Sequence, residues 1–303
     1  MPSQIGAGTS ILLGQDGFNN TGTFQYTGLF GGSSDRDISI QSFTGFTNGG
    51  IIENTVAGQM LLLTGDITTG GSGTLPTLGL IGAGNGELSG DILGASPLAV
   101  TKSGTGTWTL SGNNTYTGAT AINAGTLLVS GSISGSAVTV NNTGTLGGDG
   151  GTVGALTANI GGTVAPGASI GTLNSGSATF GAGSAFALEI NTTTHTTDLL
   201  AVTGSLSLSA TNDSILNVTD LAAGIYNGTP LAFITYTGTW NGGLFNVGGL
   251  PIADHGTFTV GANTFTLDYD YGGNSVALIP EPGSVALLLG GLGMLGFRRR
   301  RRA

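Results

Sequence analysis

The sequence predicts an all-β fold: a β-solenoid (parallel β-helix) with a C-terminal β cap and a short C-terminal transmembrane helix. A Gly-Thr pair recurs with spacings of 19, 19 and 18 residues, at Gly106, Gly125, Gly144 and Gly162. Short runs follow these pairs: Thr107–Leu110 alternates Thr with apolar residues, and Thr126–Val129 begins with the same Thr-apolar step. A fixed period of about 20 residues with obligatory turns is typical of stacked coils. Because one coil cannot bury its apolar face alone, its neighbours must cover it.

The composition supports a strand-and-turn protein. Gly makes up 59 of 303 residues without a strict triplet period, which excludes collagen. Apolar residues reach 39% and charged residues only 8%, so the chain is not of the disordered class. Gly allows positive φ at many tight corners. The sequence contains no Cys, so it offers no disulfide and no Cys-ligated metal.

Charge divides sharply along the chain. Five of its seven basic residues lie at the C-terminal end, and the body carries only Arg36 and Lys102 against fifteen acids, a net of about −13. Nucleic-acid binding requires several Lys or Arg contacts to phosphate. We therefore expect no nucleic-acid partner.

We expect four regions. Residues 1–54 form an N-terminal β region whose true start lies upstream, because Met1–Asn20 lacks the basic and apolar segments of a secretion signal. Residues 55–223 form the solenoid, 224–279 an aromatic-rich β cap that covers its end, and 280–303 a sorting tail. The cap aromatics offer an alternative interpretation as a sugar-stacking surface; they are Tyr226, Phe233, Tyr236, Trp240, Phe245, Phe258, Phe265, Tyr269 and Tyr271.

One stretch resembles a known repeat. Residues 102–131 read KSGTGTWTLSGNNTYTGATAINAGTLLVSG. This run resembles the autotransporter-associated β-strand repeat of bacterial exported passenger proteins, and a looser likeness continues to about Ser209. The resemblance implies a parallel β-helix. An autotransporter passenger would need a C-terminal membrane barrel, and the sorting tail occupies that place instead.

The tail itself reads IPEPGSVALLLGGLGMLGFRRRRRA over Ile279–Ala303. Pro280, Glu281 and Pro282 favour an extended backbone. As a helix, the apolar run Ser284–Phe297 would measure roughly 21 Å, short of the ~30 Å hydrocarbon core. Including Ile279–Gly283 and letting the arginines snorkel gives a marginal membrane span. The positive-inside rule keeps the basic cluster cytoplasmic; its members are Arg298, Arg299, Arg300, Arg301 and Arg302.

This order of motif, apolar helix and Arg cluster resembles the PEP-CTERM sorting signal of Gram-negative and related bacteria. The resemblance implies an exosortase as partner, with processing at or near Pro280-Glu281-Pro282 and the Arg cluster as cytoplasmic retention signal. It also implies a transient inner-membrane anchor, then the cell envelope, cell surface or extracellular matrix, with exopolysaccharide as a further partner. An ordinary C-terminal membrane anchor is the alternative.

Catalytic groups are scarce. His195 and His255 are the only histidines, sixty residues apart, and we interpret both as polar surface or turn residues. Asp268 and Asp270 would share one strand face about 6.6 Å apart, as would Asp35 and Asp37, yet turn or edge solvation accounts for both pairs. Polysaccharide lyases on such scaffolds use Arg or Lys as the base, and the body of this chain contains only Arg36 and Lys102 for that role.

We therefore expect no enzyme, no catalytic or metal residues and no cofactor. The predicted function is a non-catalytic, exported structural or adhesive protein linked to exopolysaccharide or biofilm. The alternative is a carbohydrate-active enzyme, a polysaccharide lyase or hydrolase on a parallel β-helix.

Overall fold

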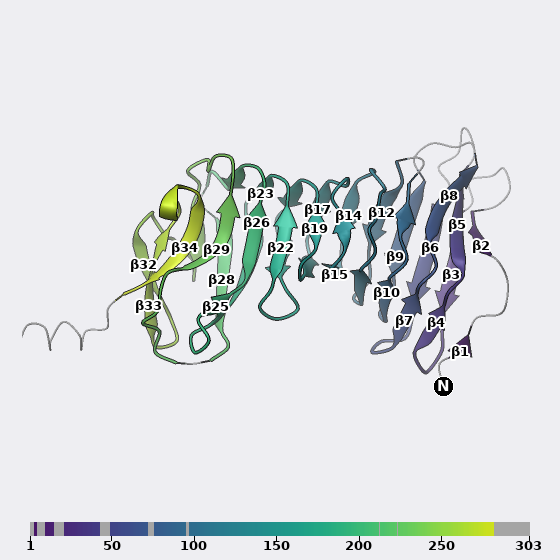
Figure 1. Ribbon diagram of the computed structural model, residues 1–303, viewed down its shortest axis with the longest axis horizontal. Helices are drawn as coiled ribbons and strands as arrows, with labels where there is room; N and C mark the ends of the chain where they lie inside the picture. Colours follow the sequence, from purple (N-terminus) through teal and green to yellow (C-terminus); the bar gives the residue numbers. More distant parts are fainter. Residues whose placement is uncertain are drawn as a thin grey trace, which may run out of the picture.

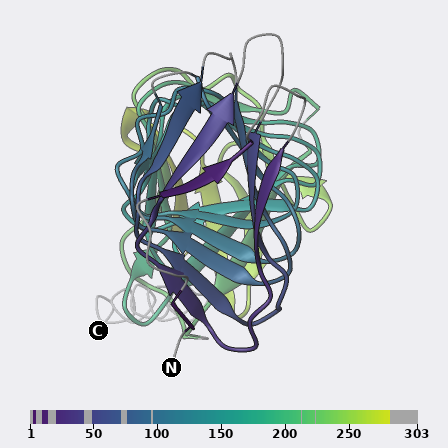
Figure 2. The same ribbon diagram turned by 90° about the vertical axis from the view of Figure 1, so that its right-hand side faces the viewer.

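The described residues of the computed structural model are 3–4, 10–14, 21–42, 49–71, 76–94, 97–211, 213–222 and 224–281. Their strands stack along one axis, from the N-terminal coils at one end to the yellow strands at the other (Figure 1). Nearly all pairings between neighbouring coils are parallel, and the walls surround a common interior when the molecule is viewed along its axis (Figure 2). The predicted all-β class and the stacked parallel strands are confirmed.

Four sheets form the walls. Sheet A contains, in spatial order, β1(Ser3–Gln4), β4(Gly32–Ser34), β7(Met60–Leu63), β10(Asn85–Leu88), β13(Thr107–Leu110), β15(Gly125–Val129), β18(Gly144–Gly148), β21(Thr163–Pro166), β24(Ala185–Asn191), β28(Ser214–Asp220), β30(Phe245–Val247) and β31(Leu250–Pro251), with β25(Thr196–Thr197) paired to β24. Sheet C contains β27(Leu206–Leu208), β23(Ala178–Phe180), β20(Leu156–Ala158), β17(Val138–Val140), β14(Thr120–Ile122), β12(Ala99–Lys102), β9(Thr77–Ile81), β6(Gly49–Asn54) and β3(Gly22–Tyr26).

The third side is made by two sheets in succession. Sheet B serves the early coils with β11(Ile92–Leu93), β8(Ile67–Gly71), β5(Asp37–Ser42) and β2(Ser10–Leu13). Sheet D serves the later coils and the C-terminal end with β16(Ser132–Ile133), β19(Thr152–Val153), β22(Thr172–Ser175), β26(Leu199–Val202), β29(Leu231–Tyr236), β34(Ser275–Pro280), β33(Asn263–Asp268) and β32(Gly256–Val260).

The Gly-Thr period corresponds to one coil. Thr107 pairs with Thr126, Thr126 with Thr145, and Thr145 with Thr163, each on the next strand of sheet A. Parallel pairing also joins β3 to β6 and β6 to β9. The division of the chain at residues 54 and 223 stays a prediction.

The core fills the tube between the sheets. Strands such as β13 and β15 bury every second residue, and Trp108, Leu110, Leu127 and Val129 are fully buried. Side chains that alternate across a strand put one set inside and the other in water. Each fully buried Leu or Val contributes about 1.5–3 kcal/mol relative to its exposed state.

Polar ladders fix the corners between coils. Asn141 donates from Nδ2 to Oδ1 of Asn123 at 2.8 Å, and Asn159 donates in the same way to Asn141 at 2.8 Å. At another corner, Oδ1 of Asp37 accepts the N–H of Asp66 at 2.9 Å, and Oδ1 of Asp66 accepts that of Asp91 at 2.9 Å. The regular Asn and Asp spacing thus satisfies backbone and side-chain groups that the turns leave unpaired.

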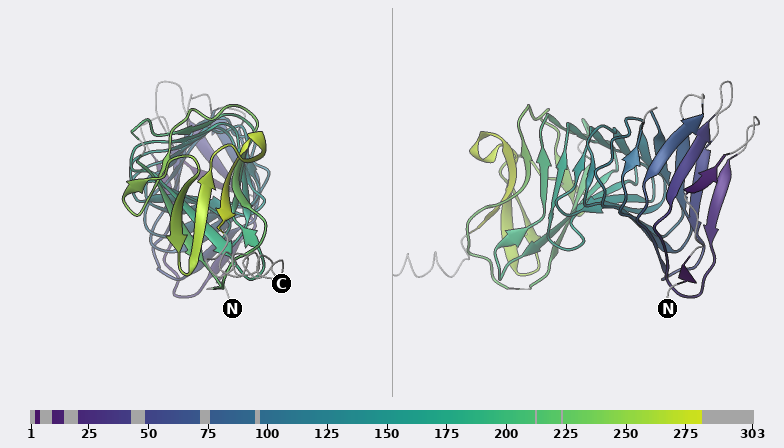
Figure 3. Two further views of the ribbon diagram at one scale, coloured as in Figure 1. Left: turned by 90° about the vertical axis from the view of Figure 1, so that its left-hand side faces the viewer. Right: turned by 45° about the vertical axis from the view of Figure 1, so that its right-hand side comes forward.

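The C-terminal end switches to antiparallel pairing. β29 pairs with β34, β34 with β33, and β33 with β32, and these strands lie across the end of the solenoid (Figure 3). The last element before β34 is the short 3-10 turn η1(Tyr271–Gly273). Antiparallel strands at this end cover a core that the last coil would otherwise expose.

The predicted transmembrane helix at 284–297 lies outside the described residues. Within the part of the chain that the structure describes, no helix has the length and apolar character needed to cross a membrane.

Candidate functional site

The start of the sorting tail is tied to the cap. β34 ends at Pro280, which pairs with Phe265 of β33. The backbone N–H of Glu281 donates to the carbonyl of Thr264 at 3.0 Å, and the hydroxyl of Thr266 donates to Oε1 of Glu281. The backbone at Pro280 is extended, as expected, and hydrogen bonds hold Glu281 against β33. Pro282 and Arg298–Arg302 lie outside the described residues.

A groove runs over the outer face of sheet A. It has a volume of about 320 Å³ and is lined by Thr107, Thr126 and Thr145, which occupy equivalent positions on three successive coils. Leu128 lines it beside the threonines, and Glu189 and Asp198 also line it. The column of threonines places hydroxyl donors and acceptors at the strand spacing of about 4.8 Å.

Asp198 is a buried carboxylate at this groove, held by the backbone. Its Oδ1 accepts the N–H of Gly171 at 3.0 Å and its Oδ2 accepts the N–H of Glu189 at 2.7 Å. Burial raises the pKa of Asp198 to about 6, against the lowering effect of these two bonds, and the charges of Glu189 and Asp149 raise it further. The sequence did not reveal that Glu189 and Asp198 lie together, because it is the hairpin of β24 and β25 that brings these two acids together across nine residues.

The two histidines lie in turns, each with positive φ, 60° at His195 and 61° at His255. The ring of His195 meets Tyr226 edge-on at 5.0 Å between centroids. His255 instead lies beside Asp254 and Asp268. A hydrogen bond to Asp254 and the charges of both carboxylates raise the pKa of His255.

The expected carboxylate pairs do not share strand faces, and this expectation was wrong. Asp268 is the last residue of β33, so Asp270 lies beyond the strand, where its Oδ1 accepts the hydroxyl of Tyr236 at 3.1 Å. Asp37 begins β5, and Asp35 lies in the link before it. In both cases the end of a strand lies between the two acids, so only one of them belongs to the strand.

The two basic residues considered as lyase bases are engaged elsewhere. Lys102 is fully buried and donates from Nζ to the carbonyls of Ser103 at 3.1 Å, Gly104 at 2.8 Å and Ala124 at 3.0 Å. Arg36 donates to the carbonyl of Ser10 at 2.7 Å. Lys102 therefore braces a corner of the solenoid and does not reach the groove.

Most cap aromatics belong to the core. Seven of the nine are buried, namely Tyr226, Phe233, Tyr236, Phe245, Phe258, Phe265 and Tyr269. Trp240 stacks on Tyr269 with centroids 5.0 Å apart and an interplanar angle of 5°, and its Nε1 donates to the carbonyl of Gly243. The alternative interpretation as a sugar-stacking surface is therefore wrong for these seven residues, because their rings are buried in the core.

Comparison with known proteins finds two family matches. Residues 100–129 match the passenger-associated-transport-repeat, and residues 278–302 match the PEP-CTERM protein-sorting motif. The first covers β12 to β15 with Lys102 and Trp108, and the second begins inside β34. The chain thus carries an autotransporter-related repeat and a PEP-CTERM sorting motif, as the sequence predicted.

The chain is also similar to an adhesin, the BmaC autotransporter of Brucella suis biovar 1 (strain 1330). The two are 32% identical over 169 residues, which is 53% of this chain. The chain spans only 4% of the length of that relative. The likeness therefore concerns a small part of a much longer protein.

Proposed function

We propose that this chain is a non-catalytic, exported protein of the cell surface or extracellular matrix with a structural or adhesive role. The observation that carries the proposal is the PEP-CTERM match over residues 278–302, which begins in the last strand of the cap. In this proposal the solenoid is the exported part of the chain, and the tail is its sorting signal.

Sorting depends on an exosortase acting at or near Pro280, Glu281 and Pro282. The apolar run after them anchors the chain transiently in the inner membrane, and Arg298–Arg302 stay cytoplasmic because translocating five arginines is costly. Everything before the tail then lies on the outer side, and cleavage releases it to the cell envelope, surface or matrix.

Adhesion to exopolysaccharide is supported by the groove of sheet A and by the likeness to an adhesin. Thr107, Thr126 and Thr145 present hydroxyls that can both donate to and accept from sugar hydroxyls. Repeated weak contacts of this kind along a solenoid add up to avid attachment when many chains face one polymer.

The experiment is fractionation of cells that contain an exosortase, followed by mass spectrometry of the C-terminus of the extracellular form. We expect a mature chain that has lost Arg298–Arg302. The Glu281→Ala variant should stay in the membrane fraction with its arginines, while Glu53→Ala, on β6, should be processed normally. An extracellular form that keeps all five arginines would reject exosortase processing.

A second candidate, a carbohydrate-active hydrolase, is favoured by one observation. Asp198, with a pKa raised to about 6, and Glu189 line the same groove, and glycoside hydrolysis uses one protonated and one ionised carboxylate. Both oxygens of Asp198 are occupied by backbone N–H groups, which suits a structural clasp better. Incubating the full chain and its Glu189→Gln variant with exopolysaccharide separates the two: shortening of the polymer by the parent alone identifies the enzyme, and retention without shortening the adhesin.

A further inference from the structure

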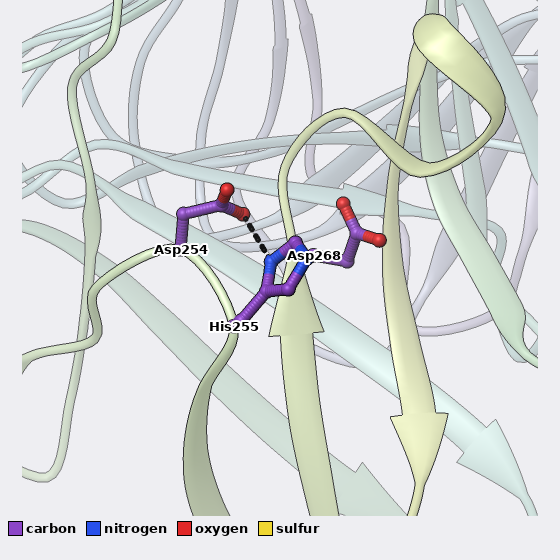
Figure 4. A group of neighbouring side chains, drawn as sticks. All are labelled: Asp254, His255 and Asp268. Atoms are coloured by element: carbon purple, nitrogen blue, oxygen red, sulfur yellow. Dashed lines mark ion pairs between the residues drawn. The ribbon is translucent and has the colours of Figure 1, made fainter.

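Three potential metal ligands gather at the cap, remote in sequence from the repeat. One ligand atom from each of Asp254, His255 and Asp268 lies within 4.8 Å of the other two. Nδ1 of His255 is 3.1 Å from Oδ1 of Asp254, and the imidazole lies between the two carboxylates (Figure 4). The cluster is thus mixed, with one nitrogen ligand and two oxygen ligands.

The backbone holds the three residues in place. The N–H of Gly256 donates to the carbonyl of Ala253 at 2.7 Å and closes the turn that carries His255. The N–H of His255 donates to the carbonyl of Leu267 at 2.8 Å, which extends the β32–β33 ladder by one bond. Asp268 follows Leu267 directly, so the turn and the end of β33 meet at the cluster.

Each carboxylate is positioned separately. Oδ1 of Asp254 accepts the N–H of Tyr269 at 3.1 Å, and Oδ1 of Asp268 accepts the N–H of Asp270 at 3.0 Å. Tyr269 is fully buried, and its hydroxyl donates to the carbonyl of Ile252 at 3.0 Å and accepts the N–H of Phe245 at 2.7 Å. Tyr269 therefore fixes the backbone on both sides of the site, and rigid outer contacts of this kind tune metal ligands.

The cluster is open to solution and negatively charged. The side chain of His255 is 68% exposed and that of Asp254 is 44% exposed, so an ion can enter without movement of the fold. Arg36 and Lys102, the arginine and lysine among the described residues, donate to carbonyls elsewhere. A divalent cation would balance the charge of both carboxylates.

We propose that Asp254, His255 and Asp268 bind a divalent transition-metal ion, Zn²⁺, with water completing the coordination. One imidazole with two carboxylates suits Zn²⁺, whereas Ca²⁺ and Mg²⁺ favour oxygen ligands alone. The site joins the turn before β32 to the end of β33, which pairs with β34, the strand in which the sorting motif begins. It is independent of the adhesive role and of exosortase processing.

The test is equilibrium dialysis of the full chain against ZnCl₂, with the bound metal counted by mass spectrometry, and the absorption spectrum of the Co²⁺ form as a second readout. We expect saturable binding of one ion per chain. His255→Ala and Asp268→Asn should each weaken it by at least about 10–100-fold, the usual cost of losing even a group that only supports a metal ligand. The matched control is His195→Ala, which removes the other histidine and should bind as the parent does.

Thermal unfolding checks that each variant is folded, and Zn²⁺ should raise the Tm of the parent and of His195→Ala but not of His255→Ala. Absence of saturable Zn²⁺ binding by the parent would overturn the proposal. So would binding that survives both His255→Ala and Asp268→Asn, or displacement of Zn²⁺ by an equal concentration of Ca²⁺.

Discussion

The indole ring of Trp108 lies against Gly86, its register partner on the neighbouring coil of sheet A. A Cβ on residue 86 would lie 2.5 Å from Cε3 and Cζ3 of that ring. Trp108 is fully buried, so its ring has little room to withdraw. The largest side chain of the repeat is thus accommodated by the smallest residue of the coil before it.

Gly86→Ala should lower the free energy of unfolding by about 1–3 kcal/mol, the usual cost of overpacking a dense core. Urea denaturation measures the change. Gly79→Ala on β9 is the control, because its Cβ would lie 3.3 Å from the nearest atom, Cγ1 of Ile51, and it should change stability by less than about 1 kcal/mol. Equal losses in the two variants would show that contact with the indole is not the cause.

The regular part of the fold could be predicted because its signal repeats. The spacing of the Gly-Thr pairs equals one coil, and the alternation after each pair marks the inward residues, so Thr107–Leu110 matches β13 in both bounds. By contrast, the strand expected to carry both Asp268 and Asp270 ends at Asp268, because the chain turns through Asp270 and Gly272, with φ 65° at Gly272.

The candidate sites depend on pairings that local patterns do not encode. Asp254 and Asp268 meet only through the register of β32 and β33, and Glu189 meets Asp198 only through the β24–β25 hairpin. Lysine is a residue type that usually lies on the surface, yet three carbonyls of the solenoid corner surround the ammonium group of Lys102. The sorting motif was found because its order is linear along the chain.

Lys102 should make stability rise with pH. Burial lowers its pKa to about 8 from 10.5, because desolvation disfavours the ammonium form. Between these values the unfolded chain holds a proton that the folded chain has released, so the free energy of unfolding increases with pH, by up to about 3 kcal/mol across the full window. Below pH 8, Lys102 is protonated in both the folded and the unfolded chain, and the desolvation of its ammonium group lowers the free energy of unfolding by its full amount.

Urea unfolding from pH 7 to 9.5 tests this, below the range in which the buried tyrosines ionise; the pKa of Tyr116 is raised to about 12. The Lys102→Met variant keeps the length of the side chain without its charge, and its stability should change little over the same range. A parent whose stability is flat or falls between pH 8 and 9.5, relative to Lys102→Met, would contradict the shift.

The asparagine ladder should show a position effect. Asn141 makes two side-chain bonds, to Asn123 and from Asn159, whereas Asn123 makes one bond within this ladder. At about 0.5–1.5 kcal/mol for each bond, Asn141→Ala should destabilise more than Asn123→Ala. A double-mutant cycle of the two by urea denaturation should give a non-additive term. Equal single effects that simply add would mean that solvent replaces the ladder without cost.

Thr266 should restrain processing of the tail. Its hydroxyl donates to Oε1 of Glu281, and the N–H of Glu281 donates to Thr264, so the start of the motif must leave β33 before a protease can hold it extended. Thr266→Val removes only the hydroxyl bond, worth about 1.5 kcal/mol for a charged acceptor, which corresponds to roughly tenfold more of the open form. If opening limits the reaction, pulse-labelled cells should process this variant up to about tenfold faster.

The control Thr257→Val changes the exposed partner of Thr266 on β32 and should leave the rate unchanged. Equal rates for the parent and both variants would mean that release from β33 precedes a slower step in the membrane, and the contact with Glu281 would then serve the cap alone.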